Sequence, residues 1–355
     1  MLDNYSYCPT LYARQAEIRA LTQLPSVTKD KLFPLIVIRP WPKAKHLTKT
    51  WEKVKEALGK HRFAADLDDF ARDSGKPYPA AAEFDSLFEP AGGFTKYYGA
   101  VAVVDEAVPV LRTSAGVVVE FDAQADHIDK IDRGLVLRIN HDDGGDFTKL
   151  IDLVLDRFED VSIFVDAGWS KDILAREMWT SSVIEHASRS RPEIELVVAG
   201  SSFPETFANI EERGVNPVQE RYLYENLVRR HNSAVLIYGD WGSTRPPCVA
   251  TPMTNVPRID LPMSKEWISF RRDKEVQGGE DYSDIAKRVI SDKAWLKTLD
   301  VWGARIIEWT AKGEDIAIRG PATAAASRIN IHLHKQAFFD APTIVSDGDE
   351  PFTDD

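Results

Sequence analysis

The sequence predicts an α/β fold of the (β/α)8 TIM-barrel-like type, in which parallel strands alternate with helices. Short apolar runs typical of buried strands alternate with helical patterns from about residue 34 to residue 300. Seven or eight such units suit a closed barrel better than an open sheet. No Gly-x-Gly-x-x-Gly pattern follows the first run, which removes the main indication of a Rossmann fold.

The predicted strands are the apolar runs themselves. They cover residues 34–40, 63–69, 108–113, 135–140, 161–168, 194–202 and 233–241, with 267–272 as a candidate eighth strand. Apolar residues recur at helical spacing between them, and the predicted helices cover residues 47–61, 94–107, 125–134, 147–158, 174–187 and 220–231. Residues 75–93, rich in Pro, Ala and Gly, are expected to form an extended loop.

The regular alternation ends after the seventh strand. A proline-rich segment, Pro246–Pro262, follows it and is the expected lid or partner surface. Two further helices are predicted at 281–296 and 322–339. We therefore expect one barrel-like domain over residues 1–340, with irregular insertions late in the chain, and an acidic, flexible tail over 341–355.

Composition and charge exclude several functional classes. The 355 residues include 56 acidic and 44 basic ones, and a formal net charge of −12 disfavours binding to nucleic acid or to an anionic membrane. No apolar run is long enough to cross a membrane, and the first residues lack the features of a signal peptide. Cys8 and Cys248 lack metal-ligand spacing. We expect a cytoplasmic protein whose partner is a small anionic ligand or another protein.

Charged and aromatic side chains recur where the predicted strands end. In barrels of this type the ligand binds at the carboxyl ends of the strands. The candidate catalytic residues there are Asp68, Asp166 and Asp240, and the candidate ligand-binding residues are Arg39, Arg112, Arg138, His141 and Trp241.

Three interpretations of these residues stay open. Arg39, Arg112 and Arg138 suit phosphate or carboxylate, since guanidinium groups bind both in a bidentate manner. Alternatively, Asp68, Asp166 and Asp240 serve an enzyme acting on a phosphorylated or nucleotide substrate, as acid or base or as ligands of an oxygen-preferring metal near His141. In the third interpretation, Arg–Asp pairs only hold the barrel mouth together. The sequence specifies no cofactor.

Four segments together resemble the Beta-protein family of phages and bacteria, with a T-even phage protein as its expected type member. They are YCPTLYARQAEIRAL from Tyr7, KLFPLIVIRP from Lys31, YGDW from Tyr238 and SRINIHLHKQ from Ser327. Two departures stand out: Arg39 precedes Pro40 where an acidic residue is expected, and Ala326-Ser327-Arg328 replaces an expected Trp/Arg pair. The resemblance implies a barrel-like fold and a setting of phage–host conflict, without an established reaction.

Overall fold

The structure is a computed structural model of the chain. It describes residues 1–72, 75, 78–114, 117–246, 256–272 and 281–340. The predicted tail (341–355) and the central part of the expected lid (247–255) lie outside the described residues.

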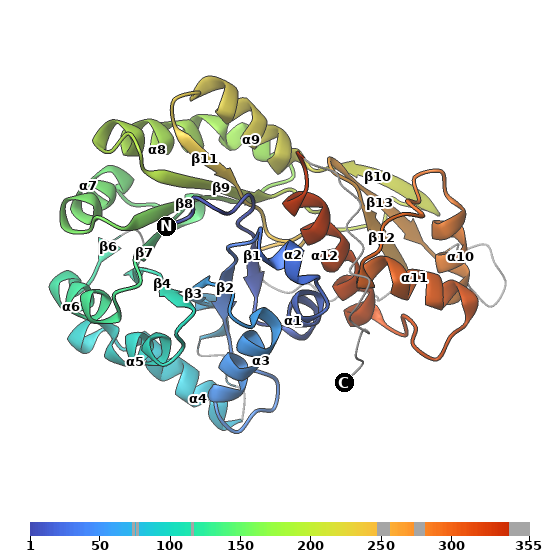
Figure 1. The fold of residues 1–355 in the computed structure, drawn as a ribbon, viewed down its shortest axis with the longest axis horizontal. Helices are drawn as coiled ribbons and strands as arrows, with labels where there is room; N and C mark the ends of the chain where they lie inside the picture. The colour runs from blue at the N-terminus through green and yellow to red at the C-terminus, as the bar shows by residue number, and fades with distance from the viewer. Residues whose placement is uncertain (73–74, 76–77, 115–116, 247–255, 273–280, 341–355) are drawn as a thin grey trace.

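Two four-stranded parallel sheets form the larger part of the molecule (Figure 1). The first has the order β1 (Thr10–Tyr12), β2 (Leu35–Ile38), β3 (Phe63–Leu67) and β4 (Ala107–Pro109). The second has the order β11 (Val235–Tyr238), β9 (Glu195–Ser201), β8 (Val161–Trp169) and β7 (Leu135–Asn140). The seven predicted strands between residues 34 and 241 are confirmed as strands. β1 was not predicted, because three residues are too few to show a pattern.

The two sheets meet at both edges through isolated parallel bridges. Val110 pairs with Val136 beside β4 and β7, and Tyr7 pairs with Tyr238 beside β1 and β11. Backbone hydrogen bonds support each junction. Leu111 N donates to Val136 O at 2.9 Å at the first, and at the second Cys8 N donates to Tyr238 O at 2.9 Å and Thr10 N to Asp240 O at 2.7 Å. The strand pairing therefore confirms the predicted α/β fold of parallel strands and helices as two sheets with short contacts between them, and a closed barrel is not confirmed.

Helices cover the outer faces of both sheets (Figure 1). They are α3 (Thr48–Leu58), α4 (Pro79–Asp85), α5 (Ala91–Ala102), α6 (Phe121–Ile131), α7 (Phe147–Arg157), α8 (Glu177–Ser190) and α9 (Gln219–Arg230). Helix α4 corrects the prediction of an extended loop over residues 75–93. Pro79 stands in the first turn, where its missing N–H costs nothing, and three alanines with high helix propensity follow it.

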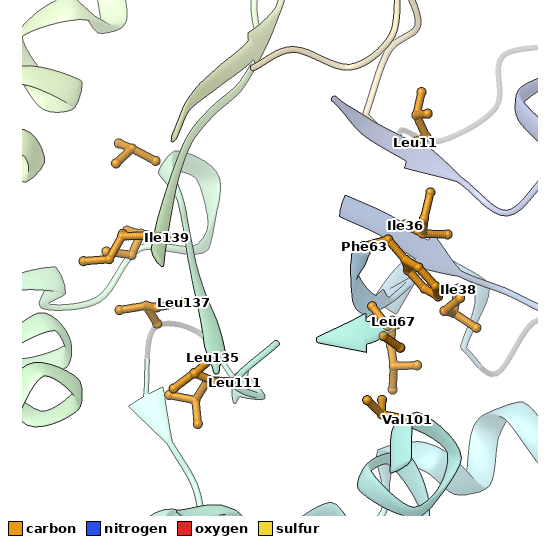
Figure 2. Packing of buried hydrophobic residues seen from close by; sticks show 14 of the residues in the cluster. Leu11, Ile36, Ile38, Phe63, Leu67, Val101, Leu111, Leu135, Leu137 and Ile139 are labelled. Atoms are coloured by element: carbon orange, nitrogen blue, oxygen red, sulfur yellow. The ribbon is translucent and has the colours of Figure 1, made fainter. Parts of the chain in front are cut away.

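Side chains along each strand alternate between the helices and the space between the sheets. On β7, Leu135, Leu137 and Ile139 pack with the helices, whereas Val136 belongs to a separate inner apolar cluster. Figure 2 shows this outer set on β7 pointing away from Ile36 and Ile38 of β2. The period of two therefore gives each sheet an apolar outer face and a second face directed inward.

A second region follows the sheets in the chain. Three antiparallel strands form its sheet, in the order β10 (Arg213–Pro217), β13 (Glu266–Arg271) and β12 (Arg258–Pro262). β12 and β13 pack with α10 (Tyr282–Ser291) and α11 (Trp302–Lys312) around an apolar cluster. The candidate eighth strand at 267–272 is thus β13, and assigning it to the parallel set was wrong. An apolar run of this length does not reveal its pairing partner, which here is β10.

Helix α12 (Pro321–Ala337) lies between the two regions (Figure 1). It packs on α1 (Gln15–Thr22) and lies near α2 (Ser26–Lys29), with a hydrogen bond from Asn330 Nδ2 to Ala20 O at 2.9 Å. Short elements complete the described chain: β5 (Thr113–Ser114), β6 (Val117–Val118) and the 3-10 turns η1 (Asp69–Ala71), η2 (Ser86–Phe88), η3 (His141–Asp143) and η4 (Ile173–Arg176). Within the described ranges, no helix combines the length and apolar character needed to span a membrane.

The contact between α11 and α12 leaves no room for a side chain at Gly303. A Cβ there would lie 2.4 Å from the backbone oxygen of Ser327. We expect Gly303→Ala to lower the free energy of unfolding by about 1–3 kcal/mol, because the helices must move apart. Gly99→Ala, in α5 with nothing within 4 Å, is the matched control and is expected to be neutral or stabilising. Equal stability of the two variants in urea unfolding would contradict this packing.

Candidate functional site

The alternation along the strands places charged side chains on the inner face near the carboxyl ends. Asp66 follows Ala64 on β3, Arg138 follows Val136 on β7 and Asp166 follows Phe164 on β8, each two residues further along the same face. The inner face is therefore apolar deeper in and ionic where the strands end. Charges at such depth must be paired to be tolerated.

These side chains form one connected set, which we call the strand-end network: Asp69, Arg112, Asp66, Arg138, Asp166 and Trp241. Asp66 accepts hydrogen bonds from Arg112 Nη1 at 2.6 Å and from Arg138 Nη1 at 2.9 Å. Arg112 Nη2 also donates to Asp69 at 2.9 Å. Arg138 Nη2 donates to Asp166 Oδ2 at 2.7 Å, and the Trp241 indole donates to Asp166 Oδ1 at 3.2 Å.

The network arginines have little capacity left for a ligand. All three donor nitrogens of Arg138 donate to carboxylates, and its guanidinium lies 5.1 Å from the Trp241 ring centroid. Burial by itself would lower the pKa of Arg138, but the charges of Asp166 and Asp66 more than offset it and raise that pKa. Arg112 and Arg138 are therefore paired with aspartates in this network.

Asp240 lies at the opposite junction of the two sheets. It is fully buried, and its carboxylate accepts hydrogen bonds from Tyr7, from Tyr238 at 2.9 Å and from the Gly242 N–H at 2.7 Å, with His332 Nε2 at 2.7 Å. Burial tends to raise the pKa of Asp240, but His332 and these hydrogen bonds lower it below its ordinary value. Asp240 joins the β1–β11 junction to α12 through His332. It lines neither of the two cavities at the strand ends.

A cavity of about 240 Å³ opens at the strand-end network, and we call it the strand-end cavity. Five aspartates and two arginines line it: Asp66, Asp68, Asp69, Asp142, Asp143, Arg112 and Arg138. Trp241 and the exposed ring of Phe70 also border it. Burial raises the pKa of Asp68 despite the nearby Arg39. The charged part of the cavity lining is thus mainly carboxylate.

A larger cleft of about 830 Å³ adjoins it, and we call it the arginine cleft. Four arginines line this cleft, namely Arg14, Arg39, Arg245 and Arg328, against two acids, Glu17 and Asp68. They come from the start of α1, the end of β2, the loop after β11 and α12. The cleft is therefore locally basic in a chain whose formal net charge is −12.

The predicted site residues are thus divided among several places. Arg112, Arg138, Asp166 and Trp241 come together in the strand-end network, whereas Arg39 and Asp68 meet in the arginine cleft at 3.5 Å. His141 lies beside the strand-end cavity and contacts Asp142 at 2.8 Å. Within the described ranges, no group of three or more His, Cys, Asp or Glu side chains is arranged to hold a metal ion, and Asp68, Asp166 and Asp240 have separate partners.

The sequence analysis missed three of the cleft arginines. Arg14 and Arg328 are in segments that carry the family resemblance, and Arg245 stands in the loop after the seventh strand. Site residues were predicted only at the ends of strands, and Arg39 is the one cleft arginine that stands at the end of a predicted strand. Arg14 and Arg328 are brought together by the packing of α12 on α1, which spacing in the sequence does not show.

Fold and site together define an α/β protein of parallel sheets whose strand ends carry a buried ionic network beside a basic cleft. The Beta protein family model matches residues 7–338, so the chain belongs to that family. The sequence is also 28% identical over 346 residues to Protein beta of Enterobacteria phage P4, covering 94% of this chain and 93% of that protein. The family resemblance is confirmed, with phage P4 in place of the expected T-even phage as the source of this relative.

The strand-end network makes Asp66 a stability determinant. Removing it leaves Arg112, which is buried, and Arg138, whose side chain is 15% exposed, with one partner fewer each. We expect Asp66→Ala to lower the free energy of unfolding by about 3–5 kcal/mol. Asp129→Ala, which breaks the exposed pair with Arg157, is the matched control and should cost about 0–1 kcal/mol. Similar urea midpoints for the two variants would contradict a structural role of Asp66.

Proposed function

We propose that this protein binds a small anionic ligand, bearing a phosphate or a carboxylate, in the arginine cleft. In this proposal the two sheets and their bridges act as one (β/α)8-like barrel, and the cleft adjoins its C-terminal mouth. The observation that carries the proposal is the convergence of four arginines on one cleft with only two acidic residues among its lining. Arginine is favoured where planar anions are bound by paired N–H donors.

The cleft arginines have guanidinium N–H groups that are not directed to protein carboxylates, unlike those of Arg138 in the strand-end network. The sole ion-pair partner of Arg39 among the described residues is Asp68, at 3.5 Å, and that of Arg245 is Glu205, at 3.7 Å. Arg14 directs both Nε and Nη2 to one oxygen of Glu17. These long or single-sided contacts leave most of each guanidinium edge open to a ligand.

The ring of Tyr12 lies against two of these guanidinium groups. The Tyr12 ring centroid lies 4.1 Å from Arg14 Cζ and 5.8 Å from Arg39 Cζ, so one ring lies beneath both. Arg328 is bound by Asp260 at 2.8 Å and by Ser243 at 3.2 Å, and forms a fixed wall of the cleft. A pre-positioned cation loses little conformational entropy on binding, which favours affinity.

The family and the chemistry of the cleft give the proposal its setting. We place the protein in the cytoplasm and in phage–host conflict, since its relative is a phage protein and the family resemblance implies that context. The enzyme alternative now depends on Asp68, whose raised pKa and position on both cavities suit a general acid or base. Asp166 and Asp240 are less suited to that role, because their oxygens accept hydrogen bonds from the protein itself.

The test uses the two cleft arginines with the fewest protein contacts. We expect the double variant Arg39→Gln/Arg245→Gln to bind inorganic pyrophosphate at least tenfold more weakly than the unmodified chain, because two charge-assisted hydrogen-bond donors are lost. Isothermal titration calorimetry measures the Kd. Arg189→Gln, an exposed arginine paired with Glu185 on α8, is the control and should leave the Kd unchanged.

Two results would contradict the anion site. One is an unmodified chain that does not bind pyrophosphate at low salt. The other is a double variant that binds it as tightly as the control does. Either result would favour a protein partner as the occupant of this surface.

A further inference from the structure

The arginine cleft and the strand-end cavity share a wall. Asp68, Phe70 and Pro246 line both spaces. A ligand whose anionic group lies in the cleft can therefore extend past Phe70 into the cavity. The two compartments differ in chemistry, since the cleft presents guanidinium groups and the cavity presents carboxylates.

Phe70 stands at the border with most of its ring in solvent. It is 67% exposed, although apolar side chains of this size are usually covered. The turn η1 fixes its position directly after β3, where Asp68 accepts the Phe70 N–H at 3.1 Å. An exposed aromatic ring on the wall of a cavity provides a stacking surface for a flat heterocycle.

The cavity also has hydrogen-bonding groups that the protein leaves unused. Asp143 accepts no hydrogen bond within the described ranges, and Asp69 uses one oxygen, Oδ1, for Arg112. The cavity thus offers carboxylate oxygens of Asp143 and Asp69 as acceptors to N–H groups of a ligand.

We infer that the ligand is a nucleoside phosphate, with its phosphate in the arginine cleft and its base in the strand-end cavity beside Phe70. The inference rests on the proposed anion site and adds the identity of the group attached to the anion. Amino-bearing bases fit best, because their amino groups donate to the carboxylates of the cavity. A carbonyl in the place of the amino group would face the carboxylates and be repelled.

Three ligands that share one phosphate test the inference by calorimetry. CMP is expected to bind roughly tenfold or more tightly than ribose 5-phosphate, because the base adds stacking and hydrogen bonds. UMP, which has a carbonyl where CMP has its amino group, is expected to bind more weakly than CMP. Equal Kd values for CMP and ribose 5-phosphate would overturn the inference while leaving the anion site intact. Failure of all three to bind would reject the proposed function as well.

The Phe70→Ala variant locates the base. It should weaken CMP binding roughly tenfold and leave ribose 5-phosphate binding unchanged, since only the base contacts the ring. Val103→Ala, another highly exposed apolar side chain, is the matched control and should change neither Kd. An unchanged Kd for CMP in Phe70→Ala, with the thermal melting of both variants intact, would overturn the placement of the base in the strand-end cavity.

Discussion

Asp66 bridges Arg112 and Arg138, and the rest of the site depends on this arrangement. Asp66 belongs to β3 in one sheet and Arg138 to β7 in the other, so the ion pair crosses the junction that the backbone closes with a single bridge between Val110 and Val136. Buried ions of this kind are costly when unpaired. The spacing of the strand ends, and with it the shape of the strand-end cavity, is therefore fixed by charge as well as by apolar packing.

The opposite junction depends on a second buried carboxylate. Tyr7 and Tyr238 form the bridge between the sheets there, and both hydroxyls donate to Asp240, which also contacts His332 of α12. Asp66 and Asp240 thus lie at the two opposite junctions of the sheets, and each accepts hydrogen bonds from residues on both sides of its junction. The ionic groups at the strand ends thus pair with one another across the sheets. The arginines of the cleft make long or one-sided contacts instead, and for that reason we propose the cleft as the ligand site.

The sequence predicted those features of the fold and of the site that depend on residues close together in the chain. Apolar runs predicted seven parallel strands, and the strand-end rule found Arg112, Arg138 and Asp166, which do lie together. It could not separate structural from available arginines, because that depends on partners such as Asp66 from another strand. It also could not place Arg328 in the same cleft as Arg39, since this arrangement follows from the packing of α12 on α1. β13 was misplaced for a similar reason: its antiparallel partners are set by tertiary contacts.

Network arginines are paired with aspartates, whereas we propose that cleft arginines are available to a ligand. The position of a bound anion tests this difference most directly. Crystals of the full chain grown with selenate would reveal that position by anomalous scattering. The account predicts a selenate in the arginine cleft, bound by Arg39 and Arg245, with Arg112 and Arg138 still paired to Asp66. A selenate bound instead by Arg112 and Arg138, with their pairs to Asp66 broken, would contradict it.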